Sequence, residues 1–250
     1  MSLLFLLVGL ASALVSGMTG LAGGVLLLSY LSITLPIEVV IPLHAFIQVL
    51  ANLSRVLLLR QQIAWPIWKA FNLLTIPAGF LGAYSVSYLP KEVIKSAVGL
   101  VVLIAAVYTL KKTFRPAITQ QQIELDNAKK TRSFRYVVLG ATSSLLGMVV
   151  GATGPLIAPF FMIDGLKREQ FIATKSACQL TVQVIKTLIF IQVLNFSYGT
   201  YQKELILVLV GVFTGTWIAK RLLAKVSGNW LELLISMMLI VIGLRLLLGL

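Results

Sequence analysis

The sequence predicts an all-α integral membrane protein made of two homologous halves, and three observations support this fold class. Of its 250 residues, 58% are hydrophobic and 12% are charged, with a mean hydropathy of +0.97, whereas a soluble domain carries about 25% charged residues. Several apolar runs reach the roughly 20 residues that a membrane-spanning helix needs. The pattern of the first half also recurs 131 positions later, so that Gly20 and Gln48 align with Gly151 and Gln179.

The first half begins with an interrupted apolar segment and continues with three predicted spans. Residues 2–33 form a run too long for one ordinary span, and its glycines indicate two short helices that meet at a break. These glycines are Gly17, Gly20, Gly23 and Gly24. The spans that follow cover residues 39–59, 66–88 and 93–110. We assign residues 1–110 to the first membrane repeat.

A basic polar segment, residues 111–135, separates the halves. We predict a cytoplasmic linker here, because Lys and Arg are enriched in cytoplasmic loops. Residues 136–250 then repeat the plan of the first half as a second membrane repeat. Its interrupted run covers residues 136–163 and breaks at 151–155, and its three spans cover residues 171–194, 204–219 and 230–248. Identical polar pairs at the same offset, Ser12/Ser143 and Glu38/Glu169, indicate an internal duplication.

The net charge of +13 distinguishes two topologies. If each broken segment crosses the membrane once, the halves are parallel and many basic residues lie outside, against the positive-inside rule. If each broken segment is a re-entrant hairpin, each half has three full crossings and the halves are inverted. The basic loops, around residues 60–69, 111–135, 164–170 and 219–229, are then all cytoplasmic. The charges therefore favour inverted repeats, a common plan of secondary transporters.

The span after each broken segment carries a polar stripe. In the second half its residues are spaced i, i+4, i+8 and i+11, which places them on one helix face. They are Lys175, Gln179, Gln183 and Lys186, and they align with His44, Gln48, Asn52 and Arg55. Neither span, 39–59 or 171–194, contains a carboxylate. A cation at the bilayer centre costs about 2.5–3.5 kcal/mol, so an anion is the simplest partner, and amide groups supply further donors.

Alternative roles exist for several of these cations. Arg55 and Lys175 lie near span ends, where basic side chains can snorkel to the headgroups. Lys186 lies deeper in its span and fits this alternative less well. His44 is the single histidine of the chain and can serve as a neutral hydrogen-bonded imidazole between helices or as a proton-coupling group.

The two breaks are the second group of candidate anion ligands. The half-helix that begins after a break presents free backbone N–H groups and the positive end of its dipole, and both favour an anion. The residues concerned are Gly20, Gly23, Gly24, Gly151, Thr153, Gly154 and Pro155. The alternative is that small residues here only allow helices to pack closely.

Other classes of site find no support in the sequence. It shows no nucleotide-binding loop, no metal-ligand cluster and no convincing nucleophile. The single cysteine, Cys178, excludes an internal disulfide and any cluster of cysteine ligands. We therefore expect no metal, no cofactor and no enzymatic activity. Nucleic acid is not an expected partner either, because the basic residues lie in loops between apolar segments rather than in a soluble domain.

The chain resembles the sulfite exporter TauE/SafE family of membrane permeases. The resemblance rests on the two-halved hydrophobic plan, on the segment SGMTGLAGG, and on GMVVGATGPLIAPFF followed by FIATKSACQL. It implies transport of small sulfur-containing anions such as sulfite or organosulfonates. With the stripes and breaks, it predicts a secondary transporter that works by alternating access in the inner (plasma) membrane, crossing it several times.

Three other functions stay open at this point: an anion channel, a membrane enzyme acting on a lipid or sulfur compound, and a structural membrane subunit. The expected partners are a small anion and the lipid bilayer. Protons are a candidate coupling ion, and a second copy of the chain is a candidate partner in a homodimer.

Overall fold

The computed structural model describes most of the chain. The described residues are 2–19, 23–86, 88–114, 128–154, 157, 160–161, 166–222, 237, 240–241, 244 and 247. Within these ranges the regular structure is helical and no strand is present. The prediction of an all-α protein is thus confirmed.

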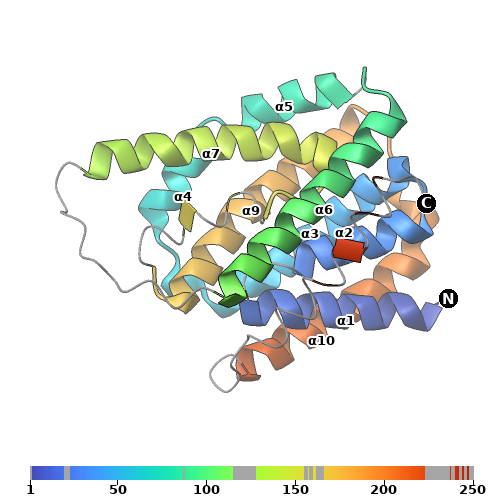
Figure 1. The fold of residues 1–250 in the computed structure, drawn as a ribbon, viewed down its shortest axis with the longest axis horizontal. Helices are drawn as coiled ribbons and strands as arrows, with labels where there is room; N and C mark the ends of the chain where they lie inside the picture. Colours follow the sequence, from blue (N-terminus) through green and yellow to red (C-terminus); the bar gives the residue numbers. More distant parts are fainter. Residues whose placement is uncertain are drawn as a thin grey trace.

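Eleven helical segments make up the described fold (Figure 1). They are α1 (Ser2–Thr19), α2 (Gly23–Thr34), α3 (Ile37–Leu58), η1 (Arg60–Gln62), α4 (Trp65–Asn72), α5 (Thr75–Val86), α6 (Lys91–Phe114), α7 (Ala128–Val150), α9 (Arg168–Gln192), η2 (Tyr198–Tyr201) and α10 (Gln202–Leu222). Of the described helices, two are long and apolar enough to cross a membrane by length and composition, residues 37–58 and 198–222.

The first broken segment is a helical hairpin. Near its tip, the backbone of Gly23 at the start of α2 lies directly against Ser12 and Ser16 of α1, leaving no room for a Cβ. At its open end, the rings of Phe5 and Tyr30 meet edge to face at 5.5 Å. Residues early in α1 therefore contact residues late in α2, so the two helices run antiparallel.

The second broken segment has the same form. The hydroxyls of Ser143 on α7 and Thr153 after the break are hydrogen-bonded at 2.9 Å. The rings of Tyr136 and Phe161 lie 5.1 Å apart at the open end. Tyr136 and Phe161 are the repeat equivalents of Phe5 and Tyr30, each displaced by 131 positions. The two halves thus close their hairpins with aromatic pairs at equivalent positions.

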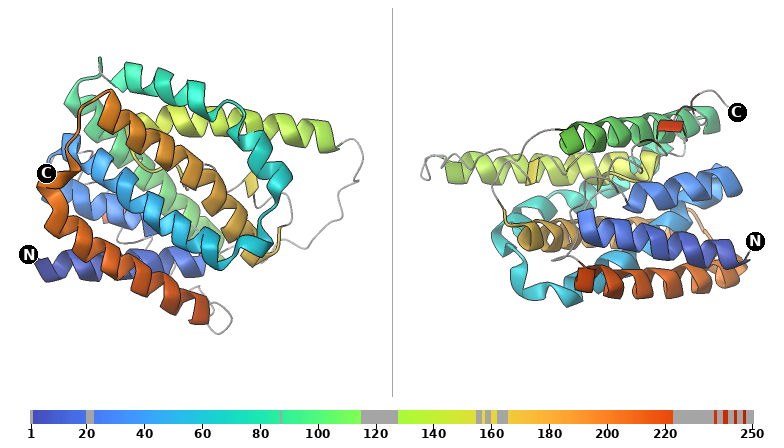
Figure 2. Two further views of the ribbon diagram at one scale, coloured as in Figure 1. Left: turned by 180° about the vertical axis from the view of Figure 1, so that it is seen from behind. Right: turned by 60° about the horizontal axis from the view of Figure 1, so that its bottom comes forward.

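Helices α3 and α9 follow the hairpins and pack against each other in the centre of the molecule (Figures 1 and 2). Ile41 near the start of α3 packs with Ile189 near the end of α9. At the opposite end, Val56 of α3 packs with Ala173 and Ala177 near the start of α9. The two helices are therefore antiparallel.

In the two remaining large contacts, a helix of one half packs against a helix of the other half. Helix α1 packs along α10, and α7 packs along α5, on opposite sides of the α3–α9 pair (Figure 1). These pairs approach closely through glycine: a Cβ on Gly9 of α1 would overlap the carbonyl of Val208 on α10, and one on Gly82 of α5 would overlap that of Leu145 on α7. Small residues permit such close packing within a membrane. Each hairpin is consequently held by a helix from the other half.

Several element boundaries differ from the sequence prediction. The span expected at 66–88 is divided into α4 and α5, with a turn at Leu73 and Leu74. Pro77 in the first turn of α5 explains the division, because proline suits the start of a helix and cannot donate the backbone hydrogen bond of a helix interior. Helix α10 is slightly longer than its predicted span, 204–219.

The predicted linker is shorter than expected at both ends. Helix α6 continues to Phe114 and α7 already begins at Ala128, within the segment 111–135. Residues 115–127 lie outside the described residues, as does most of the span predicted at 230–248.

The outer surface of the described helices is apolar. Large hydrophobic side chains on α5 are widely exposed; examples are Ile76, Phe80, Leu81 and Tyr84. In water such a surface would be unfavourable, whereas in a bilayer it faces hydrocarbon. The exposed surface thus agrees with a membrane protein.

Candidate functional site

The polar stripe of α3 faces the interior. His44, Gln48, Asn52 and Arg55 are all buried, although α3 is otherwise rich in apolar residues. The helix turns through 3.6 residues, so this spacing brings all four side chains to the face that contacts α9 and the first hairpin.

The equivalent stripe of α9 faces the same interior region. Lys175, Gln183 and Lys186 are buried, and Gln179 is half-buried. Glu169 lies in the first turn of α9, as Glu38 does in α3, where a carboxylate is favourable toward the helix dipole.

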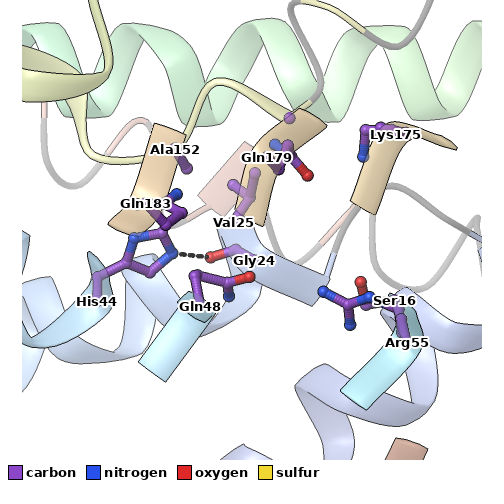
Figure 3. A pocket seen from close by; sticks show the side chains of 11 residues that line it. Ser16, Gly24, Val25, His44, Gln48, Arg55, Ala152, Lys175, Gln179 and Gln183 are labelled. Atoms are coloured by element: carbon purple, nitrogen blue, oxygen red, sulfur yellow. Dashed lines mark hydrogen bonds between the residues drawn. The ribbon is translucent and has the colours of Figure 1, made fainter. Parts of the chain in front are cut away.

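A pocket lies between the two stripes and the two hairpin tips (Figure 3). Its empty volume of about 310 Å³ includes space that is open to the surroundings. Its lining residues are Ser16, Gly24, Val25, His44, Gln48, Arg55, Ala152, Gly154, Lys175, Gln179 and Gln183. In Figure 3, His44 lies at one end of the view and both Arg55 and Lys175 at the other. The described residues of this lining include cations and amides but no carboxylate.

The first hairpin meets the pocket through Gly24. The imidazole Nε2 of His44 lies 2.9 Å from the carbonyl oxygen of Gly24 (Figure 3). That oxygen can only accept, so Nε2 carries a proton in this contact. A Cβ placed on Gly24 would come within 3.2 Å of the Gln48 amide nitrogen. Glycine therefore allows the start of α2 to lie directly against the α3 stripe.

The second hairpin meets the pocket through Gly154. A Cβ here would lie 3.0 Å from the amide nitrogen of Gln179 and 3.4 Å from the ammonium of Lys175. Three residues earlier, Gly151 has a φ of +86°, a left-handed conformation that favours glycine. The chain thus reverses at Gly151 and brings Gly154 to the α9 stripe.

Arg55 connects the two striped helices. Its Nη2 donates to Oδ1 of Asn52 at 2.7 Å, and its Nε donates to Oγ of Ser176 on α9 at 3.1 Å. Both acceptors are neutral, so these hydrogen bonds position the guanidinium without neutralising its charge. A buried guanidinium held in this way favours an anionic ligand.

Lys186 has a different environment. Its Nζ donates to the carbonyl oxygens of Gly147 at 2.6 Å and Gly151 at 3.0 Å, and its side chain is 1% exposed. These carbonyls belong to the end of α7 and the turn after it. Lys186 is not part of the pocket lining.

The structure brings together eight of the fifteen predicted site residues. The eight that line the pocket are Gly24, His44, Gln48, Arg55, Gly154, Lys175, Gln179 and Gln183. The others that are described, which lie beside the pocket, are Gly23, Asn52, Gly151, Thr153 and Lys186. Gly20 and Pro155 lie outside the described residues.

Three lining residues, Ser16, Val25 and Ala152, are missing from the sequence prediction, as is Ser176, which positions Arg55. Ser16 lies one turn before the first break and Ala152 lies within the second. Val25 directly follows Gly24 of the first break. Nearness to the breaks was the available signal for these three residues, whereas nothing in the sequence marks Ser176.

The described part of the chain contains no group of three His, Cys, Asp or Glu side chains that could hold a metal ion. Cys178, a residue of α9, is buried in the apolar cluster that contains Phe71, Tyr136 and Phe161. Its thiol therefore packs among apolar side chains in this structure.

The comparisons with known proteins agree with this architecture. The model of the family described as sulfite exporter TauE/SafE matches residues 5–246, which include both hairpins and both striped helices. No curated protein and no solved structure matches the chain. The match covers nearly the whole length of the chain, and the chain accordingly belongs to the sulfite exporter TauE/SafE family of membrane transport proteins.

Proposed function

We propose that the chain is a secondary transporter of small sulfur-containing oxyanions, sulfite or an organosulfonate, and that it binds them in the pocket between α3 and α9. One observation carries the proposal: the described lining holds Arg55 and Lys175 with three glutamine amides and no carboxylate. Guanidinium, ammonium and amide N–H groups are the donors that suit the oxygens of a sulfite or sulfonate group.

Two features of the pocket surroundings support an anion rather than a cation. Asn52 has a buried amide nitrogen, Nδ2, that lacks a hydrogen-bond partner among the described residues. Helix α2 starts at Gly23 beside the pocket, which its residues Gly24 and Val25 line. Its first backbone N–H groups and its dipole favour negative charge.

Alternating access through inverted repeats is the second part of the proposal. It is supported by the two antiparallel hairpins, by the antiparallel packing of α3 with α9, and by the equivalent aromatic pairs. Gln48 and Gln179 lie near the middle of their helices, which would place the anion near the bilayer midplane between the repeats. We assign residues 1–110 and 136–250 to the two repeats, with the basic segment between them on the cytoplasmic side of the plasma membrane.

Protons are the coupling ion that we propose. Nε2 of His44 already faces the Gly24 carbonyl, so a second proton would bind at Nδ1, which is buried and has no partner among the described residues. An anion in the pocket would favour that proton electrostatically. His44→Gln, which retains an amide donor for Gly24, should uncouple anion uptake from proton uptake measured with a pH-sensitive dye. Unchanged coupling would assign the proton to another group.

The function is tested by flux into liposomes that contain the purified protein. The panel of anions is sulfite, sulfate, thiosulfate, two organosulfonates and acetate. We expect saturable uptake and counterflow with a sulfur oxyanion and little uptake of acetate. Flux without saturation or counterflow would show an anion channel, chemical conversion of the anion would show an enzyme, and the absence of binding and flux would leave a structural subunit.

A further inference from the structure

We propose that Lys186 is a positioning residue, not an anion ligand: its ammonium group clamps the tip of the second hairpin to α9. We call its two hydrogen bonds, to the carbonyls of Gly147 and Gly151, the tip clamp. The effect of the tip clamp on anion binding rests on the proposed function, whereas the clamp itself does not.

The first argument is the chemistry of the partners. Helix α7 ends at Val150, and the last carbonyls of a helix lack partners within the helix. They also form the negative end of the helix dipole, which stabilises a cation. The ammonium of Lys186 thus meets its requirement for acceptors at Gly147 and Gly151, although it is almost completely buried.

The second argument is the position of these carbonyls in the chain. Gly151 is the residue with φ of +86°, where the hairpin reverses direction. Gly147 lies one helical turn earlier and also accepts the backbone N–H of Gly151 at 3.1 Å. Lys186 therefore binds the last turn of α7 and the reversal residue itself, and ties both to α9, the helix that carries Lys175 and Gln179.

The third argument is the comparison between the repeats. Arg55 occupies the equivalent position on α3, but its hydrogen bonds go to the side chains of Asn52 and Ser176. Arg55 lines the pocket and Lys186 does not. The two equivalent cations have therefore taken different roles: Arg55 faces the ligand site, and Lys186 fixes the hairpin that delivers Gly154 to it.

Hydrogen–deuterium exchange of the full-length protein in nanodiscs tests the tip clamp without any anion. We compare wild type with Lys186→Met, which removes the donors, and Lys186→Gln, whose amide reaches one of the two carbonyls. Arg55→Gln is the matched control. Residues 147–154 should exchange about tenfold faster in Lys186→Met, because the local opening costs less. They should exchange at an intermediate rate in Lys186→Gln and at the wild-type rate in Arg55→Gln.

Equilibrium binding of sulfite, measured by thermal shift, provides the second readout. If Lys186 acts as a clamp, Lys186→Gln should bind sulfite more tightly than Lys186→Met, because its amide keeps one of the two hydrogen bonds. Neither variant carries the charge of the lysine. If exchange at residues 147–154 is unchanged in both variants, the clamp is wrong. If both variants also lose sulfite affinity equally, Lys186 is an anion ligand. If Lys186→Met does not fold, Lys186→Gln alone tests the tip clamp: faster exchange at residues 147–154 supports the clamp, and the wild-type rate contradicts it. Failure of the wild type to bind any anion would contradict the proposed function and leave the exchange result standing.

Discussion

At the scale of single residues, Arg55 and His44 are donors in the site whose acceptors are neutral. The side chain of Arg55 is held by Asn52 and Ser176, and that of His44 by the carbonyl of Gly24. None of these partners removes a charge from the site. The positive potential at the pocket is thus available to a ligand, and the surrounding hydrogen bonds fix where the donors lie.

Arg55→Gln should weaken binding of the transported anion by about 10- to 150-fold, since a hydrogen bond to a charged group contributes about 1.5–3 kcal/mol. The measurement is the dissociation constant of the purified protein for the anion. Arg60→Gln is the matched control, because Arg60 is exposed at the start of η1, just after α3. Equal affinities for the two variants would remove Arg55 from the site.

Gly154→Ala should weaken anion binding without destabilising the fold. The added methyl would lie 3.0 Å from the Gln179 amide and 3.4 Å from the Lys175 ammonium, and these flexible ends would have to move away from the pocket. Gly147→Ala is the control, because its methyl would meet its nearest neighbours at an ordinary 3.7 Å. Thermal stability and anion affinity are measured together, and a loss of affinity in Gly147→Ala alone would contradict the prediction.

At the scale of elements, each hairpin is held by close packing against helices of the other half. Gly140→Ala would force a methyl of α7 into the carbonyl of Phe71, near the end of α4. Overpacking of this kind costs about 1–3 kcal/mol. We expect a lower unfolding temperature in Gly140→Ala, and a stability equal to wild type would show that the contact between α4 and α7 can relax.

The aromatic pairs at the open ends of the hairpins should contribute comparable stability in both repeats. Tyr136→Ala removes a buried ring from its contact with Phe161, and Phe5→Ala removes the equivalent contact with Tyr30. Each change should cost about 3 kcal/mol or more through the cavity it leaves. The control is Phe134→Ala, an exposed position on α7. Thermal unfolding in detergent compares the three variants, which should separate clearly from the control.

At the scale of the whole molecule, the contacts place specific loops at the same end. The backbone N–H of Ala64 donates to Oγ1 of Thr174 at 2.9 Å, so the loop after α3 lies beside the start of α9. At the other end, the hydroxyl of Tyr198 donates to the carbonyl of Pro42 near the start of α3. The loop after α3 and the start of α9 therefore lie at one end of the molecule, and Tyr198 and the start of α3 lie at the other.

Cysteine labelling in intact cells tests this topology. Gln61→Cys and Lys167→Cys, both at exposed positions, should react from one side of the membrane, and Thr200→Cys should react from the other. Cys178 is buried and should stay unlabelled, so the wild-type chain is the control. Labelling of positions 61 and 167 from opposite sides would exclude the inverted arrangement.

Much of the fold was predictable because hydrophobic patterning is local. Apolar runs of about 20 residues predicted the helices that became α3, α6, α9 and α10, and the glycines predicted that residues 2–33 form two helices. The division of α4 from α5 was missed, because a single proline within an apolar run has the same composition whether the helix bends or ends. The offset of 131 residues likewise predicted which positions are equivalent, though not which surfaces meet.

The sequence by itself determined the class of the protein and the positive, carboxylate-free character of the two stripes, and it predicted an internal duplication. Only the tertiary structure decided which stripe residues face the pocket, because one helix face contains residues that meet different neighbours. Arg55 and Lys186 hold equivalent places in the repeat, yet one lies at the pocket and the other binds the carbonyls of Gly147 and Gly151. Ser176, which accepts from Arg55, and the two carbonyls that accept from Lys186 belong to segments distant along the chain, so the pattern of each cation's own helix cannot specify them.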